Sequence, residues 1–455
     1  LAKKVTDLQV KGVRWRRYLM SIRHEHGCAS EGAPASADIE KCTEASIRCA
    51  ENESVSFTVK ICNINEILKS YGAVSAARVA RAVCSVISRL EVGGVPELAA
   101  DHSICLTLPR ARLADAGSLS DACRGWIRRV CRSVALVPFW TEWGVVHVWL
   151  AAEWSALVDG VEARGADGMS GFSGDAVTDP GEGASRYRRD MAVASKLLCM
   201  LARAGEDGLG GGALRIAWRP VVARASCEVL YYQSTVRLEE AVADAWLARN
   251  VLAAVERIGF RGIIDEIVVG ATVAELEAEA SVVLSASISS VGVVGSAWWA
   301  QLTRRLERAP AIAARLVLEV GEGTALARSA EVGRFCEEAR RLGCRVAITD
   351  FGAGYASVRQ LVAIAPDIVK IDRGFVRRST TSPHDREVLT GLRQLAAAVA
   401  RIVVADGVDT LAQAKLSEEL GLVWQQGHFW GRASTCRPWW GGRVSAQSGP
   451  AMLAV

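Results

Sequence analysis

The feature that most constrains the fold is a repeated alternation of strand and helix patterns after residue 187. Strand patterns occur at 214–222, 228–233, 282–287, 315–320, 345–350, 367–371 and 401–406. Helical patterns lie between most of them, for example at 328–342 and 386–400. Repeated strand–helix units over about 250 residues are typical of a closed barrel rather than an open sheet. The sequence therefore predicts an α/β protein whose C-terminal half is a parallel, TIM-like (β/α) barrel.

A smaller α/β domain is predicted before the barrel. Its strand patterns lie at 55–63, 103–108 and 144–151, and its helical patterns at 73–90 and 119–133. The next stretch is rich in Gly, Asp and Ser, a composition that buries too little apolar surface to fold alone. We predict a basic segment at 1–49, the small domain at 50–155, a Gly-rich linker at 156–185, the barrel at 186–440 and a tail at 441–455.

Composition narrows the class of protein. The net charge of +4 is small for 455 residues, which argues against a nucleic-acid binder. No apolar run reaches the roughly 18 residues of a transmembrane segment, and no secretory signal is recognisable. The thirteen cysteines form no C-x-x-C pair, so reduced thiols in a cytoplasmic protein are expected. The sequence begins at Leu1 rather than at a methionine. This start is compatible with a sensor or membrane anchor upstream.

Polar side chains occupy the predicted carboxyl ends of the barrel strands, where (β/α) barrels carry their chemistry. These residues, which include both signs of charge, are Gln233, Ser287, Glu319, Thr349, Asp350, Lys370 and Asp406. The sequence therefore predicts a functional site at this end of the barrel.

Two strand-end segments resemble motifs of the EAL domain family. Residues 349–355, Thr-Asp-Phe-Gly-Ala-Gly-Tyr, resemble D-D-F-G-T-G-Y, and residues 369–372, Val-Lys-Ile-Asp, resemble L-K-I-D. Weaker matches follow in the family's order: Trp218-Arg219-Pro220-Val221-Val222 for Q-P-I-V, residues 318–322 for L-E-I-T-E, 405–409 for E-G-V-E and 426–432 for Q-G-Y-L-F-G-R. The resemblance covers about residues 186–435.

The resemblance implies hydrolysis of cyclic di-GMP by two divalent metal ions, Mg²⁺ or Mn²⁺, held by oxygen ligands. It assigns metal binding to Glu319 and Asp350, and ligand contacts to Arg237 and Gln426. It also assigns catalysis to Lys370, and it makes Glu322 the anchor of a loop.

Several positions depart from the family pattern. Gln233 stands where E-A-L has its glutamate, Ser287 where the family has asparagine, and Thr349 where D-D has its first aspartate. Asp406 and Asp409 each replace a glutamate. Two negative charges are thus lost, at 233 and 349, and two adjacent divalent ions repel each other unless anionic ligands offset that repulsion. We expect hydrolysis to be lost or vestigial, with Lys370, Asp406 and Asp409 as vestigial catalytic equivalents and Gln233 left as a neutral ligand-binding group.

The first domain is similar to the GGDEF diguanylate cyclase domain, beginning with the strand–helix segment at 57–72. Residues 99–103, Ala-Ala-Asp-His-Ser, fall where the G-G-D-E-F turn would stand. Lys60 replaces the first metal-binding aspartate and Leu68 the nucleotide-reading asparagine. Cyclase activity is therefore not expected.

Three hypotheses follow. The first is a cyclic-di-GMP receptor or regulatory scaffold that needs no cofactor, forms a homodimer through the barrel as the resemblance implies, and contacts an unidentified protein partner. The second is an active phosphodiesterase whose Mg²⁺ or Mn²⁺ cage is built from Glu319, Asp350, Asp406 and Asp409. The third is a protein-interaction module that binds no nucleotide. Nucleic acid is not an expected partner of any of them.

Overall fold

The computed structural model describes residues 54–90, 94–113, 118–158, 161–168, 180–203, 214–238, 245–288, 297–322, 329–354 and 358–439. The predicted basic segment at 1–49 and the tail at 441–455 lie outside these residues. Within them, no helix is both long and apolar enough to be a candidate membrane span.

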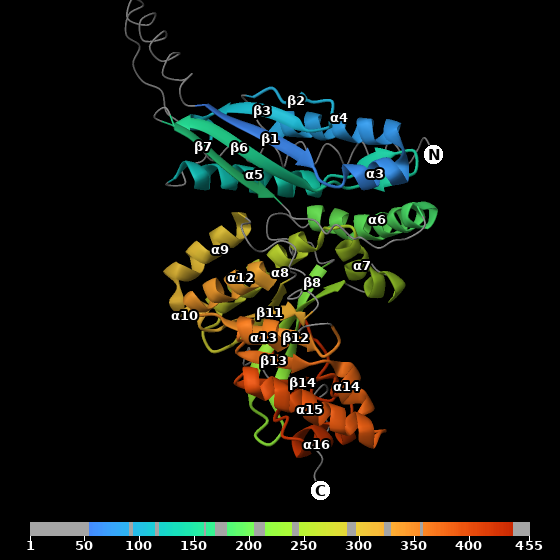
Figure 1. The fold of residues 1–455 in the computed structure, drawn as a ribbon, viewed down its shortest axis with the longest axis vertical. Coiled ribbons are helices and arrows are strands. Elements are labelled where there is room, and N and C mark those ends of the chain that lie inside the picture. Colours follow the sequence, from blue (N-terminus) through green and yellow to red (C-terminus); the bar gives the residue numbers. More distant parts are fainter. Residues whose placement is uncertain are drawn as a thin grey trace, which may run out of the picture. The chain divides into compact units, whose positions relative to one another are not determined.

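The first part of the fold is a five-stranded sheet in the order β2-β3-β1-β6-β7 (Figure 1). All neighbouring strands in it are antiparallel. Its strands are β1 (Ser54–Ile61), β2 (Glu97–Leu98), β3 (Ile104–Pro109), β6 (Leu150–Val158) and β7 (Val161–Gly168). Burial alternates along β1, so one face is covered, and the Phe57 ring there lies 4.0 Å from that of Trp126 on the helix α5 (Leu119–Ala135).

Helices and a hairpin complete this part of the chain. They are α3 (Ile64–Tyr71), α4 (Ala73–Leu90), the short 3₁₀ helix η1 (Arg110–Arg112), α5 (Leu119–Ala135), β4 (Phe139–Thr141) and β5 (Gly144–Val146). Ser118 caps α5 by accepting the backbone N–H of Asp121. One strand was predicted at 144–151, but the chain forms β5 and then β6 there.

The predicted linker at 156–185 contains regular structure. Strand β7 pairs along its whole length with β6, and helix α6 (Pro180–Arg203) begins inside the range. Strand β7 was not predicted because its sequence, Val-Glu-Ala-Arg-Gly-Ala-Asp-Gly, contains only one large apolar residue and two glycines, whereas backbone pairing depends on neither. Gly165 also suits this edge, because a side-chain carbon there would lie 2.5 Å from the indole nitrogen of Trp154.

Helix α6 contacts both the five-stranded sheet's helices and the helix that follows. Tyr187 accepts a hydrogen bond from the Asn63 amide at 3.0 Å, and Arg188 donates to the carbonyl of Ser70 at 3.0 Å. Asp190 accepts two hydrogen bonds from Arg257, both at 2.7 Å. The helix is thus fixed on two sides within a single turn.

The second part is a closed barrel in the order β10-β11-β12-β13-β14-β15-β8-β9. Its strands are β8 (Leu214–Ala223), β9 (Val229–Leu238), β10 (Leu284–Ile288), β11 (Leu316–Gly321), β12 (Arg345–Phe351), β13 (Ile368–Ile371), β14 (Ile402–Asp406) and β15 (Trp424–Gln426). The predicted barrel is therefore confirmed. The expectation that all strands run parallel is wrong at β8, which is antiparallel to both of its neighbours, β9 and β15.

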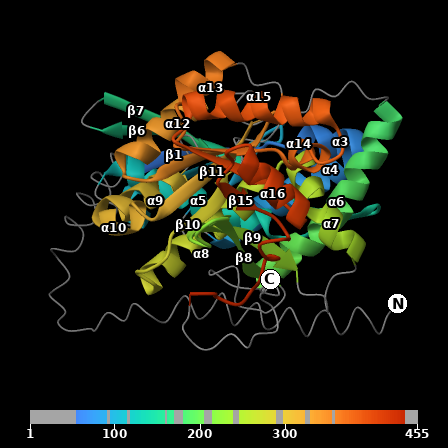
Figure 2. The ribbon, with the colours of Figure 1, turned by 90° about the horizontal axis from the view of Figure 1, so that it is seen from below.

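Helices are arranged about the strands (Figure 2). They are α7 (Ala245–Arg257), α8 (Arg261–Ala278), α9 (Ala297–Arg308), α10 (Pro310–Ala313), α12 (Ser329–Arg341), α13 (Val358–Ile364), α14 (Arg373–Arg378), α15 (Pro383–Val399) and α16 (Leu411–Glu419). Strands β11 and β13 are buried almost throughout, which explains their continuous apolar runs.

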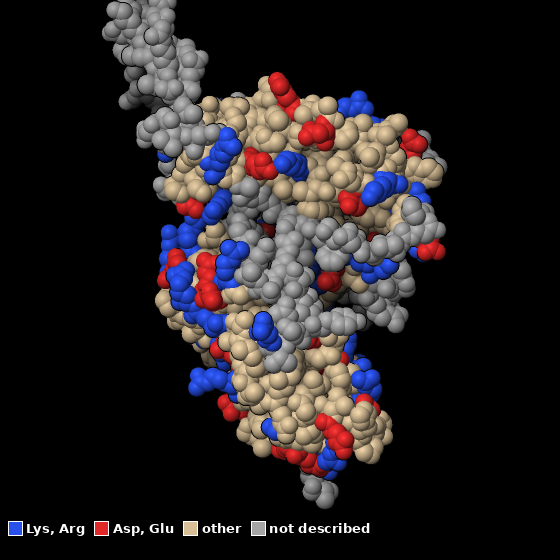
Figure 3. Space-filling model, viewed as in Figure 1, with Lys and Arg blue, Asp and Glu red and all other residues tan. Residues whose placement is uncertain are grey.

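The outer surface carries mixed charge. On the face drawn in Figure 3, acidic and basic side chains are interspersed. Two exposed ion pairs of α9 illustrate this, Arg305 with Glu277 and Arg341 with Glu307. Pairs of this kind contribute little stability individually.

Strand register brings the polar strand ends together. Ser287 lies opposite Glu319, and Asp406 opposite Gln426. The register between β12 and β13 shifts between Ile348 and Phe351, and Asp350 within this irregularity has a φ of 57°. Such a bulge re-aims the side chain at the end of its strand.

Candidate functional site

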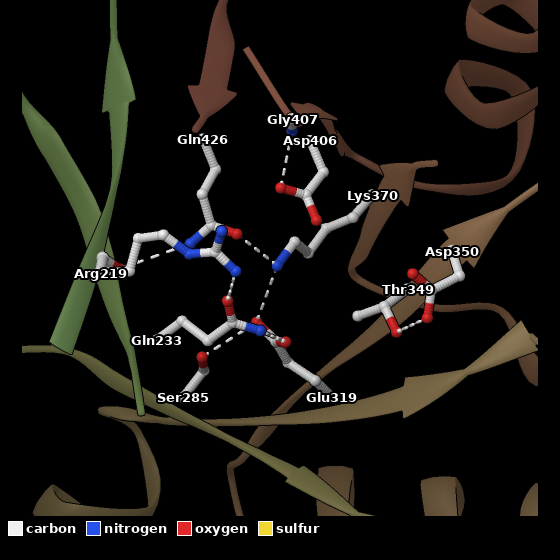
Figure 4. Close-up of polar contacts among 10 residues, drawn as sticks. All are labelled: Arg219, Gln233, Ser285, Glu319, Thr349, Asp350, Lys370, Asp406, Gly407 and Gln426. Atoms are coloured by element: carbon white, nitrogen blue, oxygen red, sulfur yellow. Dashed lines mark hydrogen bonds and ion pairs between the residues drawn. The ribbon is translucent and has the colours of Figure 1, made fainter. Parts of the chain in front are cut away.

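Glu319, at the end of β11, is the centre of the site (Figure 4). Its side chain is fully buried. One carboxylate oxygen accepts a hydrogen bond from the amide of Gln233, and the other accepts one from the Ser285 hydroxyl at 2.9 Å. Lys370 Nζ lies 3.5 Å from that second oxygen. Three donors therefore surround one carboxylate.

Gln233, on β9, links Glu319 to an arginine. Its Nε2 donates to Glu319, so its Oε1 faces the opposite way and accepts a hydrogen bond from Arg219 Nη2 at 3.2 Å. Both the nitrogen and the oxygen of the Gln233 amide therefore have a hydrogen-bond partner. The carbonyl oxygen that a metal ion would use is already occupied by a guanidinium.

Lys370, on β13, is the only lysine among the ten residues drawn in Figure 4, and its side chain is 1% exposed. Its ammonium donates to Gln426 Oε1 at 2.7 Å as well as lying near Glu319. The Gln426 amide in turn donates to the backbone carbonyl of Arg219 at 3.4 Å. The hydrogen bonds therefore form a closed ring through Arg219, Gln233, Glu319, Lys370 and Gln426, which we call the inner ring.

Two carboxylates stand outside the inner ring. Asp350 accepts a hydrogen bond from the Thr349 hydroxyl at 3.2 Å, and Asp406 from the backbone N–H of Gly407 at 2.8 Å. Loss of water around the carboxylate raises the pKa of Asp350, and the charge of Asp406 raises it further. The Thr349 hydrogen bond and Lys370 oppose this shift. The two aspartates thus repel each other at the barrel mouth.

Asp409 is engaged elsewhere. Arg377 and the backbone N–H of His428 both donate to its carboxylate. Burial by itself would raise the pKa of Asp409, but these contacts outweigh it and lower the pKa. The carboxylate predicted as a vestigial catalytic group is therefore held by a surface arginine rather than by the inner ring.

The remaining predicted residues lie at or near the same end. Glu322 accepts the backbone N–H groups of Gly352 and Gly354 at 2.9 and 2.8 Å, the geometry that a loop anchor requires. Ser287 is half-buried opposite Glu319. Arg237 is exposed, four residues beyond Gln233 on β9. Among the described residues it forms no ion pair.

Sequence reasoning missed three residues of the site. Arg219 and Ser285 make hydrogen bonds of the site, and Tyr231 is buried on β9. Burial and the charge of Glu319 raise the pKa of Tyr231 well above its ordinary value. A signal existed for Arg219, which occupies the glutamine position of the segment matched to Q-P-I-V.

The side-chain oxygens at this site are poorly suited to binding a pair of divalent ions. Within the part of the chain that the structure describes, no three His, Cys, Asp or Glu side chains are grouped to hold a metal. Hard cations need several free oxygen ligands, but both Glu319 oxygens already accept hydrogen bonds. The proposed four-carboxylate cage is also not assembled, because Asp409 pairs with Arg377.

Comparison with models of known protein families identifies an EAL domain. The model of the EAL domain family matches residues 202–433 of this chain, which is just over half of it.

Two curated relatives match segments of 117 and 118 residues. The probable cyclic di-GMP phosphodiesterase PdeA of Escherichia coli is 35% identical over 117 residues, which are 26% of this chain and 16% of the relative. The bifunctional diguanylate cyclase/cyclic di-GMP phosphodiesterase MucR of Pseudomonas aeruginosa is 34% identical over 118 residues, 26% of this chain and 17% of the relative. The matched segments thus span less than a fifth of these relatives' length.

Among solved structures, the S helix-GGDEF-EAL structure of Vibrio cholerae LapD, in its apo form, is similar over 83% of this chain and 88% of that one. The sequence identity is 13% and the TM-score 0.45.

Proposed function

This chain belongs to the EAL domain family, and from that premise we propose that its barrel mouth binds cyclic di-GMP as a receptor or regulatory scaffold, with hydrolysis lost or vestigial. The relatives whose names include phosphodiesterase support the ligand class. The arrangement of the inner ring supports the absence of turnover.

One observation carries the proposal. The carboxylate of Glu319, which the family resemblance assigns to a metal, accepts hydrogen bonds from Gln233 and Ser285 and lies beside Lys370. A metal ion would have to displace Gln233 and approach a lysine ammonium, whose charge repels it. An anionic dinucleotide would instead meet two cationic groups of the inner ring, Lys370 and Arg219.

We propose that the five-stranded sheet forms a degenerate GGDEF-like unit without cyclase activity. Residues 99–103 form the turn between β2 and β3, where Asp101 accepts hydrogen bonds from the backbone and hydroxyl of Ser103. Lys60 pairs with Glu153 at 2.6 Å instead of leaving a carboxylate for a metal. We further propose that the protein forms a homodimer through the barrel and binds a protein partner. We do not propose nucleic acid as a partner.

Calorimetric titration of the full chain with cyclic di-GMP tests the proposal. The titration is run once in Mg²⁺ and once in chelator, and each sample is then analysed for the linear dinucleotide. We expect saturable binding in both and no product. Absence of heat at high ligand concentration would favour a pure interaction module, and product that disappears with chelator would establish a phosphodiesterase.

A metal-dependent phosphodiesterase remains the second candidate because of one observation. Asp350 and Asp406 repel each other and are not paired with a cation among the described residues. A single cation held between them would relieve that repulsion. If the protein shows Mn²⁺-dependent turnover, Asp350→Asn should abolish it, whereas Asp409→Asn should leave most of it.

A further inference from the structure

Arg219 reaches the site from β8, the barrel strand that is antiparallel to both of its neighbours. On β8 it lies directly opposite Gln233 of β9 in the antiparallel register. Its Nη2 donates to Gln233 Oε1 at 3.2 Å, and its backbone carbonyl accepts from the Gln426 amide at 3.4 Å. Arg219 therefore belongs to the inner ring through both its side chain and its backbone.

The guanidinium of Arg219 has unused capacity to bind an anion. Its Nε is buried and has no hydrogen-bond partner among the described residues. No carboxylate in this part of the chain forms an ion pair with it. An arginine offers five N–H donors in a planar fork, and leaving a buried donor unpaired is unfavourable. A phosphate oxygen would satisfy these donors.

The charge of the inner ring also favours an anion. Lys370 and Arg219 are cations and Glu319 is the one carboxylate of the ring, so the ring itself carries one net positive charge, with Asp350 and Asp406 standing outside it. Figure 4 shows the guanidinium and the ammonium pointing into the same space, between Gln233 and Gln426. The family resemblance would place metal ions beside these groups.

We propose that Arg219 takes over the role of a metal ion as the cationic group that binds a phosphodiester of the ligand, so that binding is independent of divalent metal. The inference rests on the proposed receptor function and deepens it. No covalent bond is formed or broken. Guanidinium N–H groups pair with phosphate oxygens in the same way as a metal would neutralise them, but without activating water.

A competing explanation gives Arg219 a structural role, that of orienting Gln233. Two substitutions separate these roles. Arg219→Gln supplies the residue of the matched Q-P-I-V motif and can still donate to Gln233, but it removes the charge. Arg219→Lys retains the charge and loses the planar fork. Arg305→Gln, on the exposed face of α9, is the matched control.

The measurement is the Kd of cyclic di-GMP for the full chain in chelator, with thermal unfolding recorded for each variant. Charge-assisted hydrogen bonds of this kind predict a 10- to 100-fold weaker Kd for Arg219→Gln. Arg219→Lys should lie between that variant and the wild type, and Arg305→Gln should bind like the wild type. Melting temperatures should change little, whereas a structural role would lower them.

The outcomes are distinguishable. If the wild type binds nothing in any buffer, the receptor function itself fails. If the wild type binds in chelator and Arg219→Gln binds equally well, the receptor function stands and the role of Arg219 is refuted. If the wild type binds only when Mg²⁺ is present, metal-independent recognition is refuted. Should Arg219→Gln not fold, the Arg219→Lys variant and the Mg²⁺ comparison still decide the question.

Discussion

Glu319 and Lys370 form an ion pair inside the barrel, with side chains that are 0% and 1% exposed. Removing two charges from water costs several kcal/mol for each ion, and their mutual attraction offsets this only when the remaining hydrogen-bonding groups are satisfied. Here Gln233, Ser285 and Gln426 satisfy them. The hydrogen bonds of the inner ring therefore make the burial of this pair tolerable.

Replacing Lys370 by Met should destabilise the protein. Glu319 would keep its charge in a buried position without a countercharge, and losing one partner of a buried pair typically costs about 3–5 kcal/mol. The free energy of unfolding, measured by urea denaturation, should fall by that amount.

The double variant Lys370→Met/Glu319→Gln is the control for this effect. It removes both charges, so it should recover most of the lost stability. If the double variant is no more stable than Lys370→Met alone, the ion pair is not what Lys370 contributes.

Much of the site was predictable because strand ends converge in a barrel. Gln233, Glu319 and Lys370, which were singled out as strand-end residues, lie in one hydrogen-bonded ring, and Gln426, singled out by the family resemblance, joins them. Arg219 was missed for a physical reason. Reasoning from carboxyl ends applies to parallel strands, whereas Arg219 lies in the middle of a strand that runs the opposite way.

Strand β15 consists of three residues, yet its position is fixed by a close approach of two backbones. Val408 donates its N–H to Gln426 and accepts one from Phe429, at 2.9 and 3.1 Å. Between these bonds lies Gly427, where a side-chain carbon would sit 2.0 Å from the Val408 carbonyl oxygen. Only glycine allows the two segments to lie this close.

Gly427→Ala should therefore destabilise the end of the barrel. The backbone at Val408 has no room to yield, and overpacking of this kind costs about 1–3 kcal/mol or more. Because Gln426 is the adjacent residue, ligand binding should weaken as well. Thermal unfolding and the cyclic-di-GMP titration measure the two effects.

Gly391→Ala provides the comparison. Gly391 lies on the exposed face of α15, where an added side-chain carbon meets nothing within 4 Å. Alanine there should be neutral or stabilising by up to about 1 kcal/mol. Equal effects of the two substitutions would contradict the steric explanation.

The longer elements were predictable and the short or polar ones were not. The strand patterns at 315–320, 345–350 and 401–406 agree with β11, β12 and β14 to within one residue at each end. Three residues of β15 are too few to show a period, and β7 contains only one large apolar residue. The antiparallel direction of β8 leaves no trace in hydrophobic periodicity, because both directions bury side chains alike.

His147 lies in the core between α5 and α6. Its Nδ1 donates to the Ala135 carbonyl at 2.9 Å, so Nε2 accepts from the Ser195 hydroxyl at 3.2 Å. Burial lowers the pKa of His147 to about 4, with the Ala135 carbonyl opposing that shift. A neutral imidazole is thus part of the folded protein.

The stability of the protein should fall as the pH falls from about 6.5 to 4. In that range the unfolded chain binds a proton at position 147 and the folded chain does not, so proton uptake favours unfolding. The full effect approaches about 3 kcal/mol. His147→Gln should show a shallower decline in unfolding free energy over this range.

His384→Gln serves as the reference, because His384 is exposed on α15 and has no buried partner among the described residues. Its acid profile should follow that of the wild type. Superimposable profiles for His147→Gln and the wild type would show that another group governs acid stability.

Helix α6 is anchored at Tyr187 and Arg188 on one side and at Asp190 on the other. Helix α6 cannot shift relative to α3 or α7 without breaking at least one of these hydrogen bonds. Any displacement of α7 would therefore strain the contacts of α6 with Asn63 and Ser70, so a dye placed beside α3 would report movement of α7.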